Sequence, residues 1–125
     1  MEVLVDVSGI DPMAIQLLGI SMGVHVAGQA SRQFRIGRIT ALDPSGPFYE
    51  LLPRFLRLDT TDADFVEAVH SSLFFGSVNP YVGHVNYMIN DALTQAGCPA
   101  ETGKFHEVFQ FTHSHPDRIY CIVPF

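Results

Sequence analysis

A pentapeptide near the start of the chain, Gly19-Ile20-Ser21-Met22-Gly23, places a hydroxyl between two glycines. The pattern Gly-x-Ser-x-Gly is typical of a sharp strand-to-helix turn that carries a nucleophilic serine, where side chains at the glycine positions are expected to collide with neighbouring backbone. The N-terminus of the following helix would stabilise an oxyanion, with the backbone N–H of Met22 as one donor. The pattern predicts Ser21 as the nucleophile of acyl transfer. The alternative is a glycine-serine turn without chemistry.

An acid for this serine is expected later in the chain, because enzymes with this turn carry Ser, then Asp or Glu, then His. Asp43 follows a predicted strand over residues 38–42. Catalytic groups gather at the carboxyl ends of strands in open α/β sheets. We therefore predict Asp43 as the acid, the alternative being a turn-forming aspartate before Pro44.

Six histidines are available as the base, and two of them, His113 and His115, flank Ser114 near the C-terminus, in the order that the triad requires. We predict His115, which would accept the Ser21 proton at Nε2 while Asp43 orients the ring through Nδ1. His113 remains the alternative base, and both could instead lie in an exposed polar loop. The other histidines are expected to be packed or solvated (His25), to lie in the core or behind the site (His70), or to have no functional role (His84 and His106).

The elements that would position these groups alternate between strand and helix. An apolar strand is predicted over residues 14–18 directly before the turn, and a helix over 24–30 directly after it. This helix is expected to pack closely, because Ala27 and Gly28 carry little side chain. Further strands are predicted over residues 38–42, 65–70 and 83–87, and the end of a helix over 1–7 with Gly9 at positive φ behind it. This order predicts an α/β fold with a parallel sheet.

Composition limits the class of protein. A chain of 125 residues forms at most one domain, and 47% hydrophobic with 16% charged residues is a globular composition. A net charge of −6 with only 7 Lys+Arg argues against nucleic acid and against a basic membrane-binding patch. No apolar run reaches transmembrane length, and the acidic start is unlike a signal peptide. Cys98 and Cys121 could form one disulfide, but their number does not fix the redox compartment.

Several segments, taken in order, resemble the pancreatic-lipase-like superfamily, above all its phospholipase A1 branch. The resemblance covers nearly the whole chain up to about Cys98. Several ordered motifs are more specific than one pentapeptide. The matching segments lie at residues 15–28, 37–47, 57–66, 69–70, 83–86 and 96–99.

The resemblance implies a partial α/β-hydrolase fold with a mostly parallel sheet that lacks the N-terminal strands. Residues 1–125 would then be the C-terminal portion of a lipase-type α/β-hydrolase domain. It assigns Ser21 as nucleophile and Asp43 as triad acid. It further implies hydrolysis of carboxylic esters of glycerolipids in lipid catabolism, an extracellular location, and a lipid ester substrate met at a membrane or lipid-droplet interface. No cofactor is required for this chemistry.

The resemblance also suggests a structural calcium ion. Residues 57–62 resemble a calcium-binding loop of some members, in which Asp59 and Asp62 would supply side-chain oxygens to a hard cation. The alternative is a solvated acidic turn in which Asp62 caps the segment that follows. The calcium ion implied by the resemblance would be structural and would have no part in catalysis.

Three departures from the family pattern bear on activity. The chain begins just before the turn, without the family's earlier strands and second oxyanion donor, so an exposed sheet edge and apolar face are expected. Near the C-terminus, His113 stands where the family has a cysteine if His115 is the base, and Arg118 lies one place too far on. Cys98 matches the first cysteine of a lid disulfide, but its usual partner position is not cysteine.

Two functional hypotheses follow from these observations. One is a lipid esterase with a Ser21, Asp43 and His115 triad, which the intact serine and aspartate favour. The other is an inactive lipase homologue that binds or stores lipid, which the missing strands and the irregular histidine region favour. The segment between Cys98 and His113 would be a short lid, whose apolar residues could contact lipid or pack in the core.

Overall fold

The structure is a computed structural model that describes residues 3–46, 49–71 and 81–92. Four strands form one sheet in which neighbours in space are also neighbours in sequence, and every pairing is parallel. This arrangement confirms the predicted α/β class with a parallel sheet. The strands are β1 (Gln16–Ile20), β2 (Ile36–Leu42), β3 (Ala63–His70) and β4 (Val85–Met88).

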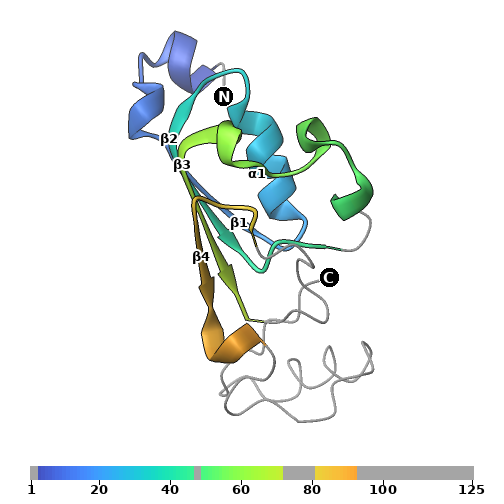
Figure 1. Ribbon diagram of the computed structural model, residues 1–125. Coiled ribbons are helices and arrows are strands. Elements are labelled where there is room, and N and C mark those ends of the chain that lie inside the picture. The colour runs from blue at the N-terminus through green and yellow to red at the C-terminus, as the bar shows by residue number, and fades with distance from the viewer. Residues whose placement is uncertain (1–2, 47–48, 72–80, 93–125) are drawn as a thin grey trace, which may run out of the picture.

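One helix, α1 (Gly23–Ser31), connects β1 to β2 and covers one face of the sheet (Figure 1). Alternation along the strands turns apolar side chains toward this helix: on β2, Ile39 and Ala41 are fully buried, whereas Arg38 between the inward positions is exposed. The core between helix and sheet holds Val24, Ala27, Ile36, Ile39, Ala41, Leu58, Ala63, Val66, Ala68 and Val82.

The strand before the serine turn begins two residues later than predicted. Residues Pro12–Ala14 instead form a single 3-10 turn, because the Asp11 side chain accepts a hydrogen bond from the Met13 N–H (3.0 Å) and Pro12 fits the first turn position. At the N-terminal end, Val3–Val7 form one helical turn, and Gly9 follows at φ +66° as expected. The predicted helix and the other three strands are present with ends shifted by one or two residues.

The opposite face of the sheet is partly apolar and open on β1. The side chains of Leu18 and Ile20 are 64% and 48% exposed. Further along this face, Arg38 forms two hydrogen bonds with the Glu67 carboxylate (3.1 and 2.6 Å), which holds the pKa of Glu67 below its usual value. Among the helices in the described ranges, none is long and apolar enough to cross a membrane.

Candidate active site

Ser21 lies at the bend between β1 and α1, in a backbone conformation that few residues other than glycine adopt. Its φ is +53°, in the left-handed region, and only 7% of the residue is exposed. The bend is held by backbone hydrogen bonds: the Ser21 N–H donates to Leu42 O (3.0 Å), and its carbonyl accepts from Val24 and Ser45 N–H (3.3 Å each). A strained serine fixed between strand and helix is the local geometry of a nucleophile elbow.

The two glycines of the pentapeptide serve different purposes. A Cβ at Gly19 would lie 2.6 Å from Val24 Cα and 2.7 Å from Val24 N, so β1 and α1 can approach this closely only without a side chain there. A Cβ at Gly23 would meet no atom of the described residues within 4 Å. Among the described residues, the predicted collision is therefore confirmed for Gly19 and wrong for Gly23.

Helix α1 begins at Gly23, two residues after Ser21. Met22 occupies the position before the helix with φ −62° and ψ −28°, and no side-chain hydrogen bond caps the helix within the described part of the chain. The positive end of the helix dipole is therefore beside the serine, where it would favour a developing negative charge. The role of the Met22 N–H as oxyanion donor stays a prediction.

Asp43 lies at the same edge of the sheet as Ser21. Ile20 of β1 pairs with Leu42 of β2. Ser21 directly follows Ile20, and Asp43 directly follows Leu42, so both leave the sheet at the same level. Asp43 is buried, has φ +43°, and donates its N–H to Val69 O (2.8 Å) at the end of β3. The sheet thus brings the predicted nucleophile and the predicted acid to the ends of adjacent strands.

Ser71 contacts the Asp43 carboxylate and was not singled out from the sequence. Its N–H donates to Asp43 Oδ1 (2.5 Å), and its hydroxyl donates to Oδ2. Ser71 directly follows β3, and the carboxyl ends of parallel strands lie at the same edge of a sheet. Its position after a predicted strand is therefore the sequence signal that could have placed Ser71 near Asp43. These two hydrogen bonds from Ser71 hold the Asp43 carboxylate in a fixed orientation.

His25 is packed rather than solvated, and it connects the elbow to the loop that follows Asp43. Its Nδ1 accepts from the Leu58 N–H (3.0 Å), so Nε2 carries the proton and donates to Ser45 O (2.8 Å). The ring stacks on Tyr49 with centroids 3.7 Å apart. Burial lowers the pKa of His25, the Ser45 carbonyl partly opposes this, and the charge of Arg57 adds to the lowering.

His70 and His84 each contact a neighbouring strand or loop of the sheet. His70 is fully buried on β3, as expected for a core or supporting residue, with Nε2 3.4 Å from Asn86 Oδ1. Its Nδ1 has no hydrogen-bond partner within the part that the structure describes. His84 lies directly before β4, and its Nδ1 accepts a hydrogen bond from the Val66 N–H of β3 (3.0 Å). The predicted base and lid fall outside the described residues, as do His106, His113, His115, Cys98 and Cys121.

The two candidate calcium ligands form a capping box around the 3-10 turn η5 (Thr60–Asp62). Asp59 Oδ1 accepts from the Thr61 N–H (3.2 Å), and Asp62 Oδ2 accepts from the Asp59 N–H (2.9 Å). Asp62 is buried and also bonds Arg32 through Oδ1 (2.8 Å), so both of its oxygens are engaged and the turn as it stands does not fit a calcium ligand set. Asp62 thus caps the turn that it ends, not the segment that follows it as considered from the sequence, and its carboxylate is ion-paired and buried instead of solvated.

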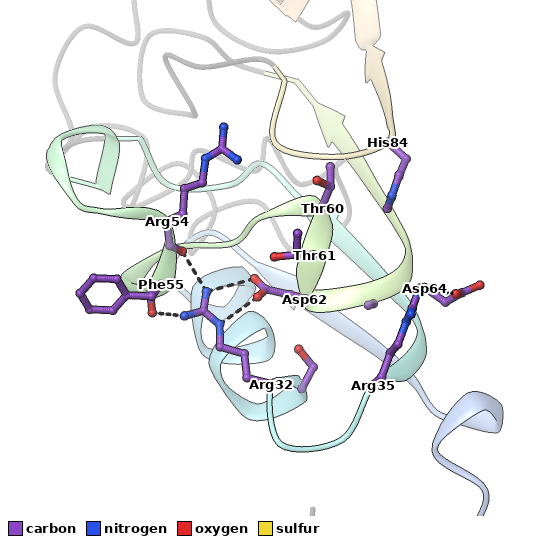
Figure 2. Close-up of a pocket in the computed structure, with 11 residues that line it drawn as sticks. Arg32, Arg35, Arg54, Phe55, Thr60, Thr61, Asp62, Asp64 and His84 are labelled. Atoms are coloured by element: carbon purple, nitrogen blue, oxygen red, sulfur yellow. Dashed lines mark hydrogen bonds and ion pairs between the residues drawn. The ribbon is translucent and has the colours of Figure 1, made fainter.

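A cavity of about 680 Å³ lies at the other end of α1 from Ser21. Its walls carry Arg32, which directly follows α1, Arg35, which directly precedes β2, and residues 60–64 before and at the start of β3 (Figure 2). Since Ser21 stands at the start of the same helix, this cavity is separate from the candidate acyl-transfer site.

Comparison with known proteins agrees with this geometry. Residues 1–111 match the Lipase family. The chain is 36% identical over 115 residues to lipase member H of Danio rerio, which covers 90% of this chain and 25% of that protein. It is 42% identical over 94 residues to phospholipase A1 member A of Rattus norvegicus, covering 74% and 21%, respectively.

A third relative extends the match to another branch. The chain is 38% identical over 96 residues to pancreatic triacylglycerol lipase of Cavia porcellus, with 70% of this chain and 20% of that protein covered. The chain thus spans a quarter or less of the length of these relatives. The parallel sheet, the serine elbow after β1 and the match over most of the sequence agree: the chain belongs to the pancreatic-lipase-like family, and its sheet is part of an α/β-hydrolase fold.

Proposed function

We propose that the protein is a carboxylic ester hydrolase acting on lipid esters, with Ser21 as its nucleophile. The observation that carries this proposal is the strained backbone of Ser21, at φ +53° between β1 and α1, with Asp43 at the end of the adjacent strand. A non-glycine residue held in this conformation stores strain, which is a recurring property of catalytic sites.

The proposed reaction proceeds through an acyl-enzyme. Ser21 Oγ attacks the ester carbonyl while His115 takes its proton, and Asp43 orients the His115 ring through Nδ1. The Met22 N–H and the start of α1 stabilise the oxyanion of the tetrahedral intermediate. His115 then protonates the leaving alcohol, and water activated by the same ring hydrolyses the acyl-enzyme to the free fatty acid. Ser71 supports this reaction by holding the Asp43 carboxylate in place.

The substrate class comes from the relatives. One is named a phospholipase A1 and another a triacylglycerol lipase, which supports a glycerolipid ester as substrate. We propose a substrate presented at a membrane or lipid-droplet surface and an extracellular location, both in keeping with the family resemblance. The chemistry needs no cofactor.

A serine-reactive fluorophosphonate tests the proposal directly. We expect the wild-type protein to be labelled and Ser21→Ala to lose labelling. A matched control is Ser31→Ala, which removes a buried serine at the end of α1 whose hydroxyl donates within the helix to Gly28 O (2.7 Å), and which should keep labelling. Absence of label on folded wild-type protein would contradict the proposal.

The same probe separates the two candidate bases. His115→Gln is expected to abolish labelling, and His113→Gln to preserve it; the reverse result would reassign the base. A folded wild-type protein that binds lipid vesicles but resists the probe would support the second function, an inactive lipase homologue that binds lipid. The sequence feature that favours this alternative is His113, which stands where the family has a cysteine.

A further inference from the structure

The guanidinium of Arg32 is surrounded by oxygen atoms of the loop between β2 and β3. Its Nε donates to Asp62 Oδ1 (2.8 Å), and one terminal nitrogen donates to Arg54 O and Arg57 O (2.9 Å each). The other terminal nitrogen donates to Phe55 O. Figure 2 shows the fork of this side chain pointing into the loop, with the carboxylate and carbonyl oxygens around it.

This set of oxygens has the composition of a site for a hard cation. Three main-chain carbonyls and one carboxylate converge on a single positive centre, which are the ligand types that Ca²⁺ takes in proteins. The planar guanidinium satisfies them through separate N–H donors instead of through one metal centre. Asp62 is 3% exposed, so its charge needs a partner inside the protein.

The sequence places the arginine where it can reach this loop. Arg32 directly follows α1, and the helix passes close to the loop because Gly28 has no side chain: a Cβ there would lie 2.7 Å from Asp62 Oδ2. Gln29 adds a second hydrogen bond from the same helix to Phe55 O (2.7 Å). The loop is therefore tied to α1 by side chains of the helix end.

We propose that Arg32 is the resident cation of the loop formed by residues 54–62, in the place that the calcium-loop resemblance would give to a metal ion. The loop of this chain is then ordered without calcium. The same oxygen atoms become a site for a divalent cation when the guanidinium is removed, because Asp62 Oδ1, Arg54 O and Arg57 O lose their Arg32 donors together. Phe55 O keeps its hydrogen bond from Gln29, and Asp62 Oδ2 keeps that from the Asp59 N–H. This inference is independent of the proposed esterase activity.

Thermal unfolding in excess EDTA and in millimolar CaCl₂ tests the proposal without an activity assay. Wild-type protein is expected to unfold at the same temperature in both. Arg32→Ala is expected to lower the unfolding temperature in EDTA by on the order of 10 °C, since it leaves a buried carboxylate without its partner. Calcium should then raise the unfolding temperature of this variant in a saturable manner, and Asp62→Asn added to it should remove that gain.

Arg35→Ala is the matched control. Arg35 also follows α1 and also pairs with an aspartate, Asp64 (3.0 Å), but that pair is exposed. Its removal should change neither the unfolding temperature appreciably nor the response to calcium. A saturable calcium shift in wild-type protein would overturn the proposal, as would an Arg32→Ala variant no more responsive than Arg35→Ala. If Arg32→Ala does not fold in EDTA, the proposal requires that calcium restore folding; failure in both buffers would overturn it.

Discussion

Acid is expected to destabilise the protein through one histidine, His25. In the folded chain its Nδ1 accepts the Leu58 N–H and its Nε2–H donates to Ser45 O, so both ring nitrogens are committed in the neutral form. Protonation of Nδ1 would place its N–H against the Leu58 N–H, so that neither donor has an acceptor there. Loss of an acceptor for a buried donor costs about 1–3 kcal/mol.

The sign follows from the lowered pKa. Because burial lowers the pKa of His25 below the ordinary value of 6.5, the unfolded chain takes up a proton in a pH range where the folded chain does not. The contribution of His25 to the free energy of unfolding is therefore fully present above about pH 6.5. It falls as the pH drops below this value, by at most about 1.4 kcal/mol per pH unit for one proton. Between pH 8 and pH 5.5 this loss is at most about 1.4 kcal/mol, the limit for a ring that stays neutral throughout in the folded chain.

Urea titrations at pH 8, 6.5 and 5.5 measure this loss. Since the chain has six histidines, the informative quantity is the difference between wild-type protein and His25→Asn, whose side-chain oxygen can accept from the Leu58 N–H without titrating. The variant should be less stable at pH 8, because it loses the stack on Tyr49, but its stability should fall less steeply with acid. Equal slopes for the two proteins would refute the assignment of a neutral, buried His25.

Two further substitutions test the elbow and the acid. Gly19→Ala should lower the free energy of unfolding by about 1–3 kcal/mol in urea, because its methyl group would meet the Val24 backbone, whereas Gly23→Ala should change it by less than about 0.5 kcal/mol; equal losses would contradict the packing described. Ser71→Ala should reduce kcat/KM for a soluble p-nitrophenyl ester about 10- to 100-fold, since a hydrogen bond to a carboxylate contributes about 1.5–3 kcal/mol. Ser71→Thr keeps the hydroxyl and should recover most of the rate, and unchanged kinetics in the alanine variant would argue against Asp43 as the acid.

The sequence was sufficient where the signal is local. A glycine-serine pentapeptide between an apolar run and a helix of small residues predicts an elbow, and the structure has Ser21 at that bend. The later start of β1 was also readable, since Asp11 before Pro12 is a capping pattern for a short turn. The position of Asp43 after a strand was sufficient to place it at the edge of the sheet that carries Ser21.

Contacts between distant segments were not readable in the same way. Ser71 reaches Asp43 only because β2 and β3 pair in parallel, and nothing in the types of the two residues indicates this contact. Arg32 resembles any surface arginine until the loop of residues 54–62 is folded around it. The error at Gly23 has the same origin, because a collision depends on where a Cβ would point and not on the residue's place in a motif.

The strand order gives the candidate site a property that its individual contacts do not. Ser21, Asp43 and Ser71 each follow a strand, and those strands are adjacent and parallel. The positions of the three side chains along the strand direction, relative to one another, are thus set by the register of strand pairing. Sliding β2 by one residue would displace Asp43 by about 3.3 Å and turn the side chains of β2 to the other face. A single-residue insertion or deletion within β2 should therefore be far more damaging than one beside Leu51, an exposed position in the loop between β2 and β3.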